Sequence, residues 1–232
     1  MMSTRGNMST FTPVGKPQTK QAYVYSTLRE AIMHCKLRPG QRLIIEDIAR
    51  ELGVSPIPVR EALHMLQSEG LVHNVAHSGS VVTPITPDSV RETFTILEGL
   101  ETVAARVAAQ RMQPEDIAEL EAIVSKMDHA VARQAEDEWS ALNKEFHTAI
   151  VKITDMPTLQ EMTIRMLDRW DRIRCFFFQG TMYHRMGQSQ QEHHQLLEAM
   201  KSKDYDQIEN IAKIHNQQAL EAYMQHIGKR EG

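Results

Sequence analysis

Two short apolar patterns of helical period, joined by one glycine turn, lie between residues 45 and 70 and constrain the fold more than any other stretch. The first pattern repeats on one helix face and comprises Ile45, Ile48, Ala49 and Leu52. Gly53 follows it, where a left-handed cap would end the helix. The second pattern, which runs up to Gly70, comprises Val59, Ala62, Leu63 and Leu66. Two helices with so short a turn between them predict a helix-turn-helix, whose second helix enters the DNA major groove.

The first turn of the second predicted helix contains Pro56 and Pro58, which are tolerated there because those amides have no partner inside the helix. Ser55 is the expected N-cap, and its hydroxyl should accept from the Ile57 amide, since Pro58 has no N–H. Four residues lie away from the apolar stripe and would face DNA: Ser55, Ile57, Arg60 and His64. The alternative for this motif taken alone is an ordinary helical hairpin with a solvated face.

Residues 71–74 and 80–83 indicate two short strands. His77, Ser78 and Gly79 then lie at the tip of a hairpin. Such a wing can lay its tip along a minor groove or a phosphate, with the His77 side chain and the amides of Ser78 and Gly79 as the contacts. The alternative is a plain hairpin that closes a small domain.

Several stretches around this motif match one known family of proteins. They are Leu37-Arg38-Pro39-Gly40, Leu52-Gly53-Val54-Ser55, Pro58-Val59-Arg60-Glu61-Ala62-Leu63 and Glu69-Gly70-Leu71-Val72, with Gly79 at the glycine of the family's wing. On these residues the chain resembles the GntR family of bacterial transcription regulators. The resemblance implies a winged helix-turn-helix domain over residues 20–85. Residues 1–19 are rich in Ser, Thr, Gly and Pro with little apolar content, which predicts a disordered tail.

The same resemblance suggests how the second helix would meet DNA. Arg60 is the expected contact to a base or phosphate, while Ser55, Ile57 and Pro58 would dock the helix start against the backbone and thymine methyl groups. Pro56 stands where many relatives have an arginine. One potential guanine contact is therefore absent, and the operator sequence is not predicted.

Charge is unevenly distributed along the chain. Residues 1–85 carry 9 Lys+Arg and 6 Asp+Glu, whereas the remainder carries 17 and 24. Excess positive charge at the DNA-binding end fits a nucleic-acid contact there. No apolar run approaches the ~20 residues of a membrane helix and no signal peptide is evident, so we expect a cytoplasmic protein without a membrane partner. Cys35 and Cys175 lie far apart and form no metal or disulfide pattern.

Beyond Pro84 and Pro87 the sequence has almost no strand signal. Helices are predicted over residues 90–107, 114–134, 136–154, 157–180, 183–201 and 205–227. About six helices with short connections predict an all-α antiparallel bundle over residues 86–229. The predicted fold class is therefore mainly α, with an N-terminal winged helix-turn-helix domain followed by this bundle.

Three histidines lie on inward faces of the predicted bundle helices. His147 shares a helix face with Asn143, one turn earlier, while His193 and His215 lie beside apolar residues of two further helices. Three imidazoles and one amide oxygen could converge on a metal ion, and imidazole suits zinc, nickel, copper or iron. The alternative is three separate hydrogen-bonded core histidines, because spacing alone does not show convergence.

This spacing is also found in a known domain. Asn143 with Phe146-His147, then Glu192-His193, then a late histidine, is similar to the FCD ligand-binding domain of the FadR subfamily of GntR regulators. The resemblance implies a bound divalent metal ion, zinc or nickel, with the ligands Asn143, His147, His193 and His215. Asn143 departs from the commoner aspartate, and a neutral amide is a weaker ligand than a carboxylate.

Carboxylate effectors are common in that subfamily, so the resemblance also implies a small organic or sugar acid as effector. Arg174 is the candidate cation for its carboxylate, because it lines up with Leu167 and Phe177 near the apolar side of its helix. The alternative for Arg174 is a salt bridge between helices.

These features predict a homodimeric, ligand-responsive repressor that binds an inverted-repeat operator in double-stranded DNA. An enzyme is not expected, because Glu145 and Glu192 are the acidic residues near the metal ligands in sequence and their helix positions point elsewhere. A metal-dependent bundle enzyme and a helical interaction protein without a ligand are the alternatives.

Overall fold

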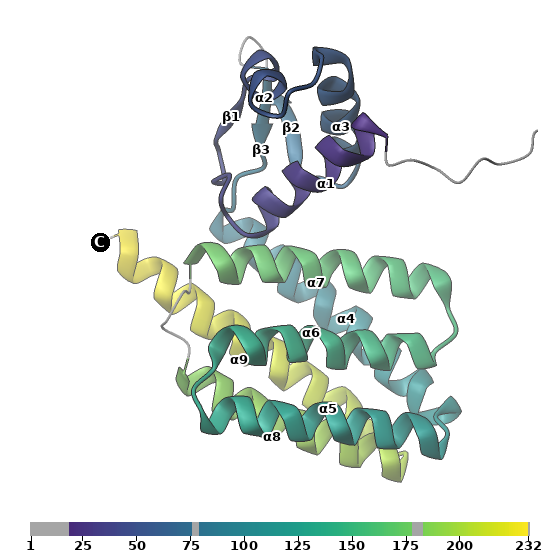
Figure 1. Cartoon of the computed structure of the whole chain (residues 1–232). Coiled ribbons are helices and arrows are strands. Elements are labelled where there is room, and N and C mark those ends of the chain that lie inside the picture. The colour runs from purple at the N-terminus through teal and green to yellow at the C-terminus, as the bar shows by residue number, and fades with distance from the viewer. Residues whose placement is uncertain (1–18, 76–78, 178–182, 232) are drawn as a thin grey trace, which may run out of the picture. The chain divides into compact units, whose positions relative to one another are not determined.

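The computed structural model describes residues 19–75, 79–177 and 183–231 (Figure 1). The chain separates into two compact units, one made of residues up to 30 with 42–81, the other of residues 31–41 with those from 82 onward. Nearly all of the predicted tail, and the wing-tip residues His77 and Ser78, lie outside the described residues.

The first unit combines helices with a small sheet. It contains β1 (Arg42–Leu43), α2 (Ile45–Glu51), α3 (Pro56–Ser68) and β2 (Val72–Val75), with all but the last residues of α1 (Lys20–Met33) and β3 (Gly79–Val82). The strand order is β1-β3-β2, and β1 pairs antiparallel with β3 so that Arg42 lies opposite Val81. The sequence does not predict β1, because two residues are too few to show strand alternation.

The turn between α2 and α3 depends on Gly53, whose φ of 65° lies in the left-handed region. The Val54 amide then donates to the Ala49 carbonyl at 3.0 Å and closes the end of α2. Ser55 precedes α3 in an extended conformation, but its side chain makes no capping hydrogen bond. The predicted bond to the Ile57 amide is therefore wrong. Pro56 and Pro58 have no N–H, so Ile57 has the only N–H group among the first three residues of α3. The Ser55 hydroxyl does not accept from it.

The second unit is helical from residue 87 onward in the part of the chain that the structure describes (Figure 1). Its helices are α4 (Pro87–Arg111), α5 (Pro114–Ala132), α6 (Glu136–Ile153), α7 (Pro157–Phe177), α8 (Tyr183–Ser202) and α9 (Tyr205–Glu231). Helix α4 packs against α6, α7 and α9, while α5 packs against α6 and α8. A winged helix-turn-helix followed by a helical bundle confirms the predicted fold class.

Local signals fix where the bundle helices begin. At the start of α4 the Thr86 hydroxyl accepts from the Ser89 amide at 3.2 Å, and the Ser89 hydroxyl accepts from the Thr86 amide at 2.9 Å. Pro87 and Pro114 occupy first-turn positions of α4 and α5. The predicted start of α5 at residue 114 agrees with the structure, whereas α4 begins at Pro87, three residues before the first apolar residue of its predicted stripe.

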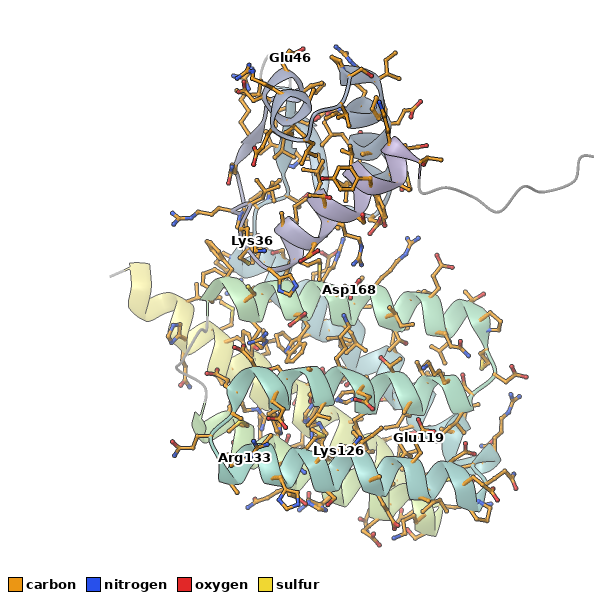
Figure 2. All side chains as sticks on the ribbon, viewed as in Figure 1. Lys36, Glu46, Glu119, Lys126, Arg133 and Asp168 are labelled. Atoms are coloured by element: carbon orange, nitrogen blue, oxygen red, sulfur yellow. The ribbon has the colours of Figure 1, made fainter. Side chains whose placement is uncertain are left out.

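Two apolar clusters fill the bundle. One includes Met127, Phe146, Met200 and Ile208, and the other includes Phe94, Leu167, Trp170 and Tyr223. Charged residues such as Glu119 and Lys126 on α5 are exposed (Figure 2). Residues of both clusters line a common cavity, which therefore lies between them. No helix in the described ranges is long and apolar enough to cross a membrane.

Candidate functional site

The outward face of α3 carries most of the residues predicted to meet DNA. Ser55, Ile57, Arg60 and His64 are exposed, and Ile57 exposes 66% of its surface, which is unusual for a large apolar residue. Pro58, also predicted to meet DNA, is buried with the apolar side of α3 and does not share this exposed face. The reason is its position, because Pro58 lies one turn before Ala62 on the buried face.

A hollow of about 370 Å³ lies next to this face within the first unit. Arg60 and His64 line one side of it, and Arg42 of β1 and Asn74 of β2 line the other. Gly79, predicted at the wing tip, also lines the hollow and has a φ of 75°. Arg42 adds a second exposed cation to the surface around α3, and the sequence did not suggest it because β1 is so short.

The three histidines of the bundle come together. His147 lies on α6, His193 on α8 and His215 on α9, and their ring nitrogens lie within 4.8 Å of one another. Their side chains are buried, with 4% of His147 and 13% of His215 exposed. Asn143 lies one turn before His147 on α6 and is buried in the same cavity wall. This arrangement can offer several neutral donors to one cation.

Carboxylates hold two of these rings. Glu101 of α4 lies 3.2 Å from the His147 Nδ1 atom, and its other oxygen accepts from the Asn216 amide at 2.8 Å. Glu192 lies 2.6 Å from the His215 Nδ1 atom. A carboxylate that accepts from one imidazole nitrogen leaves the other nitrogen as a metal donor, a usual arrangement around bound metals. The expectation that Glu192 points away from the histidines is wrong.

His193 and Asn143 lack partners that their burial should require. Neither ring nitrogen of His193, nor the Oδ1 atom of Asn143, has a hydrogen-bond partner among the described residues. Leaving such atoms unsatisfied in a core is costly, so each one needs an explanation such as an ion or an ordered water. The donor types, their closeness and these orphaned atoms all fit a divalent transition metal.

Burial in the bundle keeps the imidazoles of His147 and His193 neutral. Burial, reinforced by the neighbouring imidazoles of His215 and His147, lowers the pKa of His193 well below its usual range. Burial likewise lowers the pKa of His147. Burial alone would raise the pKa of Glu192, but hydrogen bonds from His215 and Arg185 outweigh it and lower that pKa to about 2. At neutral pH His147 and His193 are therefore in the form that binds metal, beside an ionised Glu192.

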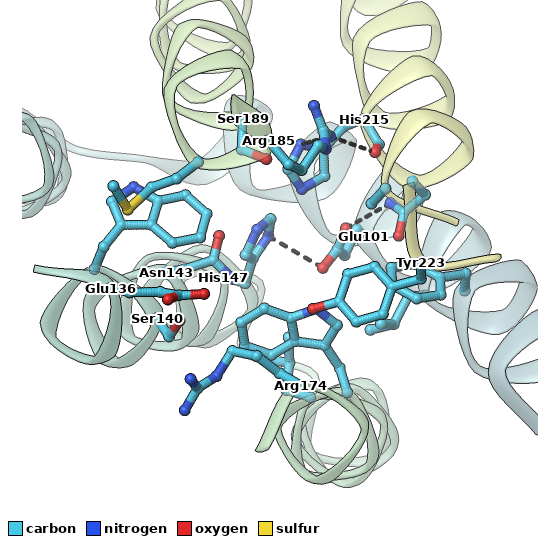
Figure 3. Close-up of a pocket in the computed structure, with 18 residues that line it drawn as sticks. Glu101, Glu136, Ser140, Asn143, His147, Arg174, Arg185, Ser189, His215 and Tyr223 are labelled. Atoms are coloured by element: carbon cyan, nitrogen blue, oxygen red, sulfur yellow. Dashed lines mark hydrogen bonds and ion pairs between the residues drawn. The ribbon is translucent and has the colours of Figure 1, made fainter. Parts of the chain in front are cut away.

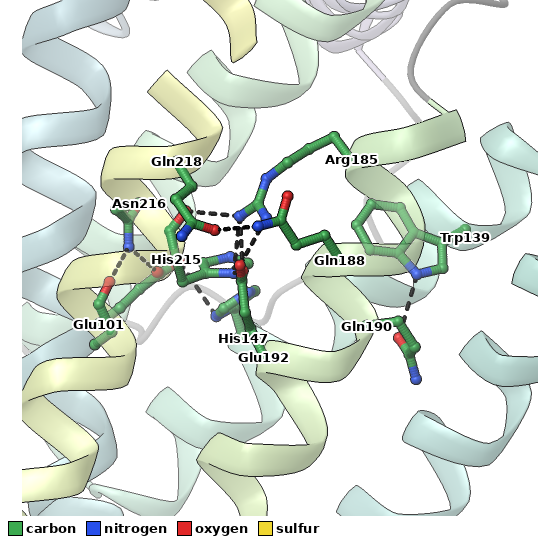
Figure 4. Close-up of polar contacts among 11 residues, drawn as sticks. Glu101, Trp139, His147, Arg185, Gln188, Gln190, Glu192, His215, Asn216 and Gln218 are labelled. Atoms are coloured by element: carbon green, nitrogen blue, oxygen red, sulfur yellow. Dashed lines mark hydrogen bonds and ion pairs between the residues drawn. The ribbon is translucent and has the colours of Figure 1, made fainter. Parts of the chain in front are cut away.

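Arg185 of α8 is the cation that sequence reasoning missed. Its guanidinium donates to both oxygens of Glu192, each at 2.7 Å, and to the His215 carbonyl at 2.8 Å (Figure 4). Its side chain is 7% exposed. Arg185 and Glu192 are two helical turns apart on α8, which puts them on the same face. This spacing was the available signal, but charged residues usually indicate a solvated surface.

Arg174 of α7 contributes to the cavity wall, but its charge is engaged elsewhere. The guanidinium lies 3.0 Å from Asp137 of α6 and 3.3 Å from Asp171, and it points away from His147 (Figure 3). The structure thus shows the inter-helix salt bridge that was the alternative for Arg174. A role with an effector would require this guanidinium to leave Asp137.

The cavity that these residues line has a volume of about 50 Å³ and is reached by side chains of α4, α6, α7, α8 and α9 (Figure 3). Its polar side carries Glu101, Asn143, His147, Arg185 and His215. Its apolar side carries Phe94, Leu97, Leu167 and Tyr223. A space of this size holds only a few water-sized groups, so a larger ligand needs some of these side chains to move.

Comparison with known proteins identifies both parts of the chain. The profile described as "Bacterial regulatory proteins, gntR family" matches residues 20–82, and that of the FCD domain matches residues 92–218. The transcriptional repressor RspR of Escherichia coli K12 is 27% identical over 94% of this chain and 95% of its own. McbR of the same strain is 28% identical over 88% and 92%.

Solved structures agree with this assignment. That of Escherichia coli McbR/YncC has a TM-score of 0.74 at 26% identity and covers 90% of this chain and 99% of its own. A putative regulator from Rhodococcus sp. RHA1, at 20% identity and a TM-score of 0.71, shares the fold. The matched families and relatives are transcription regulators rather than enzymes. The chain belongs to the GntR family of bacterial transcription regulators and carries an FCD domain after its DNA-binding domain.

Proposed function

We propose that this regulator is a ligand-responsive repressor that binds an inverted-repeat operator as a homodimer and holds a divalent metal ion in its FCD domain. The observation that carries the proposal is the gathering of three buried imidazoles, His147, His193 and His215, within one helical bundle. RspR, a relative over nearly the whole chain, is named as a repressor.

The DNA-binding part of the proposal rests on the outward face of α3. Arg60 and His64 would contact base edges or phosphates, and the exposed Ile57 would meet a thymine methyl group. Ser55 at the helix start would contact the backbone, and Gly79 with the unplaced His77 and Ser78 would contact a groove or phosphate from the wing.

The metal would be held by His147, His193 and His215, with Asn143 as a weaker or water-bridged fourth ligand. Zinc and nickel suit this imidazole-rich set. Bound there, the ion would supply a positive charge and open positions to attract an oxyanion. Glu101 and Glu192 would keep the rings of His147 and His215 oriented through their Nδ1 atoms.

The effector would be a small organic or sugar acid whose carboxylate enters the cavity. The unsatisfied Asn143 oxygen gives the cavity a polar group, and the apolar side can hold a carbon skeleton. Arg174 could bind the carboxylate if its guanidinium moved from Asp137 toward the cavity.

Two apolar side chains support the homodimer. Val103 on α4 is 45% exposed and Met162 on α7 is 49% exposed, and these two helices pack against each other. A patch across α4 and α7 would bury these residues against a second copy of the chain. Two winged helices in such a dimer match the two half-sites of an inverted repeat.

Elemental analysis tests the metal directly. Full-length protein is purified without chelator or affinity tag, incubated with zinc or nickel and desalted, beside a His147→Ala/His193→Ala variant. We expect one ion per chain in the wild type and loss of the ion in the variant. His194→Ala is the matched control, because His194 is adjacent but exposed and pairs with Asp128 at 2.9 Å. Equal metal in all three proteins, or none in the wild type, would overturn the metal site.

A further inference from the structure

Two cysteines that are 140 positions apart in the sequence lie next to each other in the second unit. The Cys35 Sγ atom is 3.8 Å from the carbonyl oxygen of Arg172, one helical turn before Cys175 on α7. Cys175 is among the groups that raise the pKa of Cys35, as expected for neighbouring side chains. Neither residue is in a disulfide. The sequence gives no sign that these two thiols are neighbours, because they are far apart along the chain.

The backbone around Cys35 is held in place. Cys35 follows the end of α1 and adopts a φ of 53°, in the left-handed region. Its amide donates to the Ile32 carbonyl at 3.1 Å, and the Leu37 amide donates to the Ala31 carbonyl at 2.9 Å. Cys175 is in the last turn of α7. Both thiols are therefore carried by ordered backbone rather than by long loops.

A hollow gives small molecules access to Cys175. Both cysteines are half-buried. Cys175 lines a hollow of about 490 Å³ whose wall also includes Lys144 and Arg174 with the carboxylates Asp137 and Asp171. Reactive cysteines are typically partly exposed, as Cys175 is here. Burial, and then the neighbouring Cys175, raises the pKa of Cys35 to about 12, so Cys35 stays a thiol at neutral pH.

We propose that Cys35 and Cys175 are a redox modification site, which a hydroperoxide converts to a reversible disulfide within one chain. The peroxide transfers one oxygen atom to the Cys175 sulfur, giving a sulfenic acid, while its O–O bond breaks and its other half leaves as water or an alcohol. The Cys35 sulfur then attacks the Cys175 sulfur, the S–O bond breaks, and the Cys35 proton leaves with the hydroxide as water. Two thiols lose two electrons in all, and the peroxide gains them.

The bond would fasten the segment between α1 and β1 to α7. The closed loop is long, so the disulfide would remove much conformational entropy from the unfolded chain. The oxidised protein should accordingly melt at a higher temperature than the reduced protein. Dithiothreitol should restore the reduced melting temperature.

The test uses full-length protein, reduced, desalted and exposed to hydrogen peroxide. We expect the intact mass to fall by two hydrogens, both cysteines to resist alkylation after denaturation, and a protease digest to contain one peptide pair joining Cys35 to Cys175. Cys35→Ser and Cys175→Ser are matched controls that remove one sulfur each. Neither should lose two hydrogens, and a sulfenic acid trapped with dimedone should form in Cys35→Ser but not in Cys175→Ser.

Three results would overturn the proposal. They are two alkylatable cysteines after peroxide treatment of the wild type, oxidation to sulfinic acid without a linked peptide, and linkage found only between separate chains. The wild-type measurement decides these outcomes even if a serine variant fails to fold.

Discussion

Helices α3 and α8 both carry residues proposed to have a function. On α3 these residues are exposed, whereas on α8 they are buried. The residues that α3 buries are all apolar: Pro58, Val59, Ala62, Leu63 and Leu66. The first half of α8 instead buries mainly polar or charged residues, among them Arg185, Ser189, Gln190, Glu192 and His193. A helix that meets a partner outside the protein can keep an ordinary apolar face. A helix that builds an interior site must replace part of that face with polar groups that satisfy one another.

This difference predicts where substitutions act. Polar residues on the outside of α3 contribute to binding and little to folding, because water already solvates them. Polar residues inside α8 contribute to folding, because each one satisfies another buried group.

The largest effect is expected when the buried ion pair of α8 loses its carboxylate. Glu192→Gln would leave the Arg185 charge buried without its partner and lower the free energy of unfolding by about 4 kcal/mol. Glu61→Gln on the exposed side of α3 is the matched control and should change it by less than about 0.5 kcal/mol. Urea denaturation of both variants measures this. If Glu192→Gln and Glu61→Gln had the same free energy of unfolding, the proposed difference between buried polar residues of α8 and exposed ones of α3 would be wrong.

A smaller effect, on binding rather than folding, is expected for Arg60→Ala. Loss of a base contact should weaken specific operator binding by about 2 kcal/mol, while the urea midpoint stays unchanged. A gel-shift titration at fixed salt gives the affinity, and Glu51→Gln, an exposed change at the end of α2, is the control. Wild-type affinity in Arg60→Ala would exclude this side chain from the interface.

The pH dependence of stability should come from the bundle. Burial lowers the folded-state pKa values of His147 and His193, so the unfolded chain binds protons that the folded chain does not. Stability of the metal-free protein is therefore complete above about pH 6.5 and falls as the pH drops below it, by up to about 1.4 kcal/mol per pH unit for each histidine. Denaturation curves at several pH values measure the slope. A His147→Gln/His193→Gln variant with an equally steep slope would contradict this origin.

The smallest effect concerns two helix starts. Thr86→Ala removes a capping bond to the Ser89 amide and should cost about 1 kcal/mol. Ser55→Ala removes no capping bond and should cost less than about 0.5 kcal/mol. Thermal melting of both variants separates them, and a larger loss for Ser55→Ala would show that its hydroxyl caps α3 in solution.

Many helix boundaries and turns depend on nearby residues alone, so they could be predicted from the sequence. Pro114 and Pro157 mark helix starts, and Gly53 marks the turn of the helix-turn-helix, because each residue restricts its own backbone. The strand β1 could not be predicted, since its two residues gain their structure from pairing with β3.

The candidate site was predictable only in part. Helical period places His147, His193 and His215 inward, but their meeting depends on how three helices pack. Glu101 was missed, although it falls on the inward stripe of α4 between Leu97 and Ala104. A charged residue on an apolar stripe is the signal that would have found it, because such burial requires a partner.

The asparagine at position 143 can be replaced by aspartate through a single base change. Each asparagine codon differs from an aspartate codon by one base, and the two side chains have nearly the same size. A single transition would therefore put a carboxylate beside His147 and His193 without repacking the core, where Asn143 is 5% exposed. The histidines come from three separate helices, so this donor set is hard to assemble anew by mutation. The charge at position 143, in contrast, can change by one base substitution while the three histidines and the fold stay the same.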